Sequence, residues 1–118
     1  MQFTICNLPK DNYIFTDKIY FMWNSNYFVY ITTNPDKTVL YVGMTNDLAR
    51  RMFEHYENRG KRETFAGCYY CYNLIFWERF DDPSHAIDRE KEIKKWRREK
   101  KEILINSQNP GWKTLRPD

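Results

Sequence analysis

The chain has 118 residues, of which 42% are hydrophobic and 18% aromatic, so one domain can bury a core without disulfide bonds or metals to hold it. Charged residues make up 30% and are mixed in sign, which argues against a long disordered chain. The net charge of +3 allows an anionic partner without requiring one.

The first 26 residues scatter aromatic side chains among Asn, Asp and Pro and have neither a helical nor a strand period. We treat residues 1–26 as an extension of uncertain structure, whose aromatic side chains could contact another protein. The chain lacks the basic and apolar segments of a signal peptide, and no stretch is apolar enough to span a membrane. Together with an odd number of cysteines, this predicts a cytoplasmic protein.

Two strands come next. Residues 27–33 (YFVYITT) and 38–43 (TVLYVG) are rich in β-branched and aromatic side chains, and residues 34–37 supply turn chemistry. The pair predicts an antiparallel hairpin. Thr45, Asn46 or Asp47 can then cap a helix that ends by residues 58–60.

The remaining chain predicts a basic loop at 60–67, a strand at 69–80 and two helices. Ser84 can cap the first of these helices, which extends to about Glu99, and residues 100–106 form the second. The order is therefore β-β-α-β-α-α. It predicts the α+β class, a short three-stranded antiparallel sheet flanked by helices, with residues 27–118 as one domain.

Three polar side chains do not fit a purely structural account of the two longer helices. Glu90 shares a stripe with Ala86 and Ile93, and a carboxylate there needs a metal or an arginine unless it reaches water at the edge. Arg51 and His55 stand four residues apart on one face, which suits a phosphate but is also typical of a solvent-facing pair. The predicted apolar positions of this helix are Leu48, Met52, Phe53 and Tyr56; the Arg51 face is offset from the last three, although Leu48 stands one turn before Arg51.

Basic residues concentrate late in the chain. From residue 89 to residue 101 there are eight Lys or Arg against three Glu, a local charge of +5. This run indicates either a solvated helix face or a nucleic-acid surface. Cys68 and Cys71 form a C-x-x-C, but nothing completes a zinc site or a redox motif, so we interpret them as ordinary strand cysteines.

Taken together, five positions resemble the GIY-YIG nuclease family. Tyr30 lies in VYI and Tyr41 in YVG, followed by Arg51, His55 and Glu90 at the family's spacing and in the expected elements. The resemblance covers residues 27–115. It extends to the closing pattern of the small standalone members, at Asn109, Pro110, Trp112 and Leu115.

Two positions depart from the family pattern. Phe28 replaces the leading glycine of the first signature, and Cys68 stands where relatives often have a basic residue. Replacing that basic residue weakens the expected phosphate contact there.

The resemblance implies a nuclease that cleaves phosphodiester bonds, most plausibly in DNA and with a preference for structure in repair or recombination. Glu90 would hold one Mg²⁺ or Mn²⁺ ion, and Arg51 would bind the phosphate oxygens. Tyr41, assisted by Tyr30 or His55, would orient or deprotonate the attacking water. The alternative is a nucleic-acid-binding domain with little or no activity. In either case the sugar-phosphate backbone of the nucleic acid would be held by basic side chains, which are Lys61, Arg62, Lys94, Arg97 and Arg98.

Overall fold

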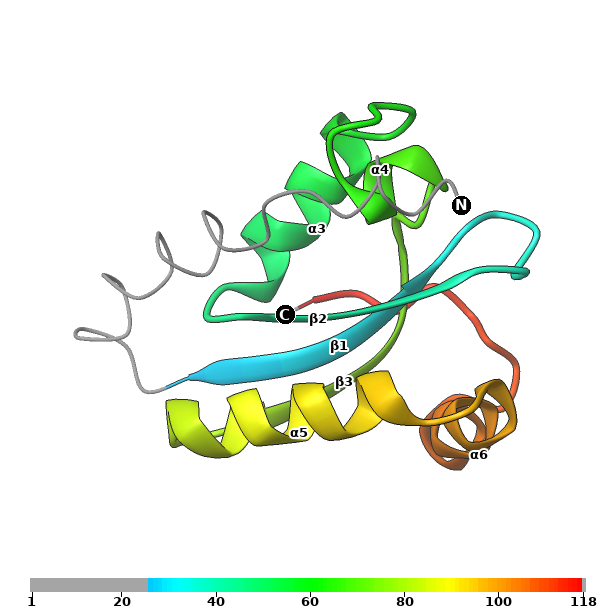
Figure 1. Cartoon of the computed structure of the whole chain (residues 1–118). Helices are drawn as coiled ribbons and strands as arrows, with labels where there is room; N and C mark the ends of the chain where they lie inside the picture. Colours follow the sequence, from blue (N-terminus) through cyan, green and yellow to red (C-terminus); the bar gives the residue numbers. More distant parts are fainter. Residues whose placement is uncertain (1–25, 118) are drawn as a thin grey trace.

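The computed structural model describes residues 26–117, which form a three-stranded antiparallel sheet with helices on both faces (Figure 1). Strands β1 (Tyr27–Thr33) and β2 (Leu40–Thr45) form the predicted hairpin, and β3 (Asn73–Phe80) pairs with the other side of β1. The strand order is β2-β1-β3, so β2 and β3 are the outer strands. The predicted α+β class is confirmed. The extension over residues 1–25 lies outside the described residues.

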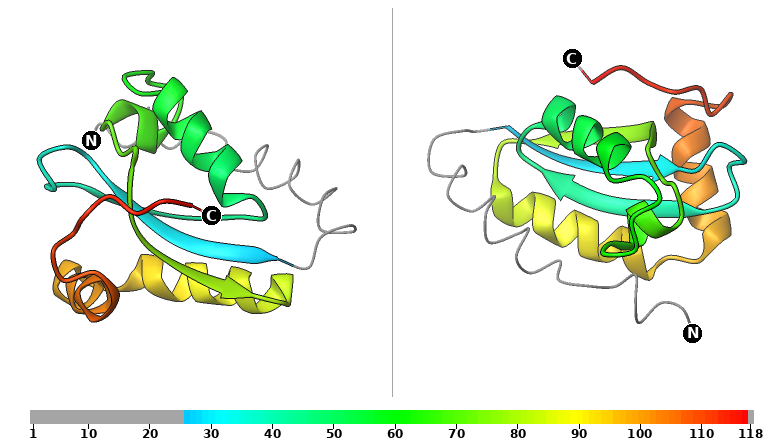
Figure 2. Two further views of the ribbon diagram at one scale, coloured as in Figure 1. Left: turned by 180° about the vertical axis from the view of Figure 1, so that it is seen from behind. Right: turned by 90° about the horizontal axis from the view of Figure 1, so that it is seen from above.

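Helices α3 (Leu48–Glu57) and α4 (Phe65–Cys68) cover one face of the sheet, and α5 (Pro83–Lys95) and α6 (Arg98–Gln108) lie on the other (Figures 1 and 2). Helix α5 packs against all three strands, and from above it lies alongside β2 (Figure 2). Between residues 26 and 117, no helix has both the length and the apolar composition needed to cross a membrane.

Several predicted boundaries are wrong for local reasons. Residues 65–68, predicted as loop, form α4, because the Thr64 hydroxyl caps this turn by accepting the Gly67 N–H. The third strand begins at residue 73 instead of 69, since Tyr70 has a φ of 60° that no strand accommodates. Asp82, not Ser84, caps α5: its carboxylate accepts the Ser84 N–H, and Pro83 takes the first helical position.

The end of α5 also differs from the prediction. The helix stops at residue 95 because Trp96 and Arg97 are both extended, with ψ of 151° and 161°. The last helix therefore begins at residue 98 rather than 100 and continues to residue 108.

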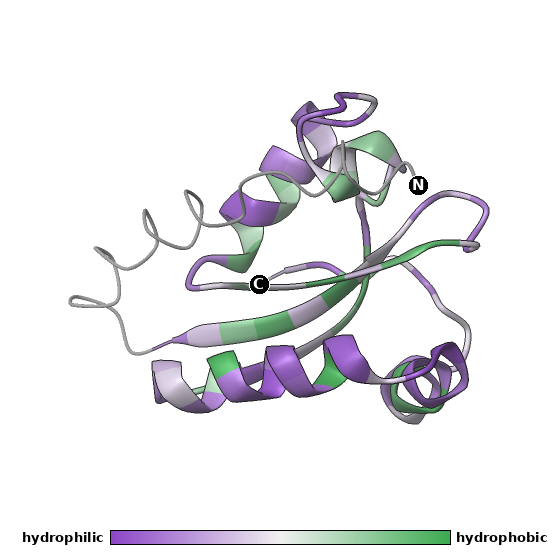
Figure 3. Cartoon of the chain, viewed as in Figure 1, coloured by the Kyte–Doolittle hydropathy of each residue, from purple (hydrophilic) through white to green (hydrophobic). Residues whose placement is uncertain are grey.

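Apolar side chains fill both faces of the sheet. On the α5 face, Val29, Ile31 and Val42 pack against Ala86 and Ile93 of the helix. This explains why the apolar positions of α5 turn toward the strands while its outer face is hydrophilic (Figure 3). A smaller cluster of Tyr30, Leu48 and Leu74 fills the α3 face.

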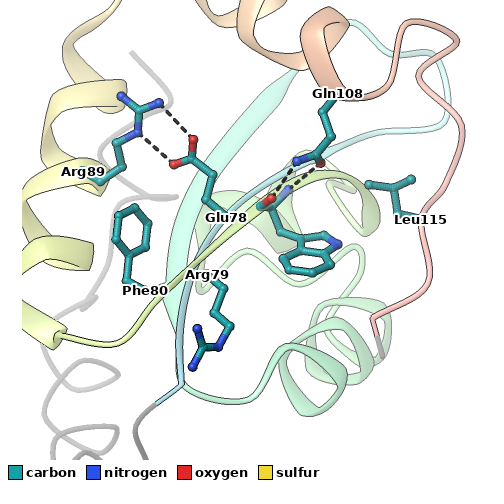
Figure 4. A pocket seen from close by; sticks show the side chains of 7 residues that line it. Glu78, Arg79, Phe80, Arg89, Gln108 and Leu115 are labelled. Atoms are coloured by element: carbon teal, nitrogen blue, oxygen red, sulfur yellow. Dashed lines mark hydrogen bonds and ion pairs between the residues drawn. The ribbon is translucent and has the colours of Figure 1, made fainter.

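The outer edge of β3 is covered by the end of the chain. The Gln108 side-chain amide donates to the Trp77 carbonyl at 2.9 Å and accepts its N–H at 3.2 Å, as a neighbouring strand would (Figure 4). Buried Asn109 donates to the carbonyls of Ile75 and Lys113, and Leu115 N–H donates to the Leu74 carbonyl. The Asn-Pro-x-Trp pattern at the end of the chain thus completes the sheet.

Candidate active site

The two motif tyrosines meet on the α3 face of the hairpin. Register places Tyr30 opposite Gly43 and Tyr41 opposite Thr32, so the tyrosines are diagonal neighbours on the same face. Their ring centroids are 6.3 Å apart, and their hydroxyl groups are hydrogen-bonded. The hairpin thus holds two phenols at one point.

Gly43 makes this close approach possible. A Cβ at this position would lie 2.5 Å from the Tyr30 hydroxyl oxygen and 2.9 Å from Cε2 of Tyr41. Such distances are not tolerated between heavy atoms. The glycine of the YVG motif therefore serves as space for the two rings, a role that sequence reasoning did not assign to it. The presence of a glycine inside a strand was the available signal.

His55 extends the pair of tyrosines into a chain of three groups. Its Nε2 shares a 2.8 Å hydrogen bond with the Tyr30 hydroxyl, and its ring lies 5.4 Å from that of Tyr41. Burial, aided by the positive charge of Arg51, lowers the pKa of His55 to about 3. The imidazole is therefore neutral at physiological pH and can accept a hydrogen bond from the Tyr30 hydroxyl.

Arg51 lies in the same centre, one helical turn before His55. Its side chain is 1% exposed and forms an ion pair with Glu54 at 3.0 Å. Burial lowers its pKa to about 10, against the opposing effect of Glu54, so it remains a cation at pH 7. The solvent-facing alternative for this pair is excluded for Arg51.

The apolar side predicted for α3 is correspondingly wrong in part. Leu48 is buried, but Phe53 is 65% exposed and Tyr56 is 47% exposed. The helix turns the Arg51 face inward instead, and the buried guanidinium pairs with Glu54 of the same helix.

Glu90 approaches the centre from α5. Its side chain is only 12% exposed and pairs with Lys94 Nζ at 3.1 Å. The positive partner expected for a carboxylate at this position is therefore a lysine. Because α5 packs against the outer strand β2, the charge of Glu90 reaches Tyr41. Burial first, and then Glu90, raise the pKa of Tyr41 well above its ordinary value. In the free protein Tyr41 therefore keeps its proton.

A metal ion at Glu90 would have few protein ligands. Within residues 26–117 there is no cluster of three or more His, Cys, Asp or Glu side chains suited to a metal. A single, nearly buried carboxylate beside a phenol matches a magnesium site in which water and substrate phosphate complete the shell. The donor set present thus fits a hard divalent ion held mainly by its substrate.

The predicted nucleic-acid contacts fall into two groups. Lys61, Arg62 and Arg97 are exposed, with 88% of the Arg97 side chain accessible, while Lys94 is held by Glu90. Arg98 is used by the fold: its guanidinium donates to the carbonyls of Lys37 and Thr38 and to Glu102.

Two other features lie apart from the centre. Cys71 is a free, buried thiol whose pKa burial raises to about 12, so it neither bonds to Cys68 nor ionises readily. Neither cysteine lies in a strand, contrary to the prediction. A shallow cavity of about 850 Å³ lies at the β3 edge, between Trp77 and the Arg89–Glu78 pair (Figure 4).

The chain is thus a small α+β domain with a tyrosine–histidine–arginine centre and one carboxylate whose charge reaches it. Comparison with known proteins identifies the family. The sequence model of the GIY-YIG catalytic domain matches residues 26–103, and the chain belongs to the GIY-YIG family. Membership implies nuclease-type chemistry and a nucleic-acid substrate.

Individual relatives carry uninformative names. A UPF0213 protein of Natronomonas pharaonis is 38% identical over 81 residues, which cover 69% of this chain and 92% of the relative. Another from Haloquadratum walsbyi is 40% identical over 81 residues, with 69% and 88% covered. The solution NMR structure of a UPF0213 protein from Bacillus halodurans has 26% identity and a TM-score of 0.47, over 75% of this chain and 92% of that one.

Proposed function

We propose that this protein is a metal-dependent endonuclease that hydrolyses phosphodiester bonds in DNA and selects DNA structures that arise in repair or recombination. The observation that carries the proposal is the hydrogen-bonded chain from Tyr41 through Tyr30 to His55, beside the cation of Arg51. Such a chain provides a path for a proton, and the cation supplies the charge that an attacked phosphodiester requires.

Arg51 binds the non-bridging phosphate oxygens in this proposal. A phosphodiester repels nucleophiles through its negative charge, and a guanidinium offers two parallel donors to its oxygens. Arg51 is 1% exposed and paired with Glu54, so its guanidinium must be uncovered before phosphate can reach it. Burial is the larger cause of the lowered pKa of His55 and the charge of Arg51 the smaller one, and a bound phosphate would offset the charge of Arg51.

The attacking water then passes its proton along the hydrogen-bonded side chains of Tyr41, Tyr30 and His55. Water donates to the Tyr41 oxygen, the Tyr41 proton moves to Tyr30, and the Tyr30 proton moves to His55 Nε2. Water becomes a hydroxide as it attacks phosphorus, and the proton ends on imidazole. This sequence leaves no phenolate beside Glu90, whose charge opposes one. The support for it is the 2.8 Å contact between Tyr30 and neutral His55.

Glu90 would hold one Mg²⁺ or Mn²⁺ ion, which when bound stabilises the charge on the leaving oxygen. The nearly buried carboxylate of Glu90 supplies a negative charge that acts on Tyr41. The exposed side chains of Lys61, Arg62 and Arg97 would contact the backbone of the nucleic acid, with Lys94 nearer the centre.

The test is cleavage of branched, single-stranded and duplex DNA in Mg²⁺ or Mn²⁺, with Glu90→Ala as the variant. We expect the wild type to cut at least one substrate and Glu90→Ala to be slower by at least about 100-fold. Asp88→Ala, an exposed acid on the same helix, is the matched control and should cut normally. If the wild type and Glu90→Ala leave all substrates equally intact, the protein is a binding domain and the proposal is wrong.

A further inference from the structure

An exposed group of aromatic rings lies where α3 ends, and we name Tyr56, Arg59, Tyr70 and Tyr72 the tyrosine platform. Tyr56 is 47% exposed and Tyr70 is 50% exposed. The Arg59 guanidinium covers the Tyr56 ring at 3.7 Å, and Tyr72 packs edge-on against that ring at 5.3 Å. The core does not need these rings at the surface, and clustered exposed aromatic groups mark interaction sites.

Tyr70 is placed by the end of helix α4. Its φ of 60° is the left-handed conformation that ends many helices, and its N–H donates to the Gly67 carbonyl while the Cys71 N–H donates to the Ala66 carbonyl. Gly60, itself at φ 83°, leaves room for the ring, since a Cβ there would lie 3.1 Å from the Tyr70 hydroxyl. The helix end and Gly60 thus fix the place of the half-exposed Tyr70 ring.

The platform is next to cations and to the catalytic centre. Residues 58–62 contain Arg59, Lys61 and Arg62 and no acid, although Glu57 and Glu63 flank them. Tyr56 directly follows His55 in α3, so the platform and the candidate centre share this helix.

We infer that the tyrosine platform binds unpaired bases of the nucleic-acid strand next to the bond that is cut. Every base has a flat face that stacks on tyrosine, whereas in a continuous duplex these faces are already stacked and out of reach. The adjacent cations attract the backbone of the same strand. The substrate class is therefore nucleic acid with unpaired nucleotides beside the cleavage point. The inference about cleavage rests on the proposed nuclease function, but binding can be measured by itself.

The first measurement is the affinity for fluorescent oligonucleotides in the presence of a chelator, so that no cutting occurs. We compare a single-stranded thymidine oligonucleotide with a duplex of equal length, using fluorescence anisotropy. Tyr70→Gly removes the ring and suits the left-handed backbone, so the fold is not weakened. We expect it to bind the single strand at least about fivefold more weakly and the duplex unchanged.

Two further variants separate the ring from general damage. Tyr56→Leu should weaken single-strand binding in the same way, whereas Tyr56→Phe keeps the ring and should retain it. Ile103→Ala removes a 69% exposed apolar side chain from α6, on the other face of the sheet, and should change nothing (Figure 1). The inference is overturned if Tyr70→Gly binds the single strand like the wild type, or if it weakens single-strand and duplex binding equally.

A cleavage arm distinguishes this inference from the proposed function. On a duplex with a short single-stranded flap, Tyr70→Gly should cut more slowly than the wild type when substrate is below saturation. Cutting by the wild type with no effect of either tyrosine variant would retain the nuclease and reject the platform. Selective single-strand binding without any cutting would retain the platform and reject the nuclease.

Discussion

Individual ionisable groups in the centre are set by burial and by one another. His55 is an uncharged acceptor because it is shielded from water and lies near Arg51, and Tyr41 retains its proton because it is shielded and lies near Glu90. Neither shift is visible in the sequence, because the main cause of each is burial by other elements of the fold. The free protein thus holds a neutral proton path between two charged side chains.

The neutral histidine has a measurable effect on stability. The unfolded chain protonates His55 near pH 6.5, while the folded protein does so only near pH 3. In between, the unfolded state binds more protons, so stability falls as pH falls from 6.5 toward 3. From pH 7 to pH 5 we expect His55 to remove up to about 2 kcal/mol from the free energy of unfolding. Urea unfolding of wild type and His55→Gln measures this; an equal pH dependence in both would contradict a neutral buried His55.

Gly43 provides a second test at the residue scale. The Gly43→Ala methyl group would collide with both tyrosine rings, so we expect a loss of about 1–3 kcal/mol in unfolding free energy and slower cleavage. Gly111→Ala is the matched control, because its methyl would meet nothing closer than 3.6 Å. Thermal unfolding and cleavage rates report the two effects. Normal activity of Gly43→Ala would mean that the close tyrosine pair is not required.

At the scale of elements, two adjacent arginines have different surroundings. Arg98 joins the start of α6 to the β1–β2 turn through the Lys37 and Thr38 carbonyls, whereas Arg97 projects into solvent. We expect Arg98→Gln to lower the free energy of unfolding by about 1.5–3 kcal/mol. Arg97→Gln should leave stability within about 0.5 kcal/mol and weaken nucleic-acid binding instead. Urea unfolding and anisotropy measure the pair, and equal effects of the two changes on stability would contradict this division.

Much of the architecture could be predicted from local chemistry. The hairpin followed from β-branched residues around a turn, and the shared face of the tyrosines followed from strand alternation. Helix α4 was missed because four residues containing a glycine carry no period. The exposed side of α3 was misjudged because Phe53 counts as apolar in a pattern, yet tertiary contacts turned Arg51 inward. The structural use of Arg98 depends on contacts about 60 residues away, which no spacing rule reaches.

For the whole molecule, the two outer strands have different tasks. The β2 side carries Tyr41 and receives Glu90 from α5, so the candidate active site forms where the sheet meets helices from both faces. The tyrosine platform continues from this centre along the end of α3. The β3 side, by contrast, is occupied by the chain's own Gln108, Asn109 and Leu115.

This covered β3 edge has a consequence for biosynthesis. Strand β3 is complete at residue 80, but its outer polar groups receive their last partner only when Leu115 has been made. A nascent chain that carries every proposed catalytic residue therefore still exposes an open strand edge, the kind of surface that pairs with other chains. Residues 108–115 thus close an edge at which the incomplete domain could pair with other chains.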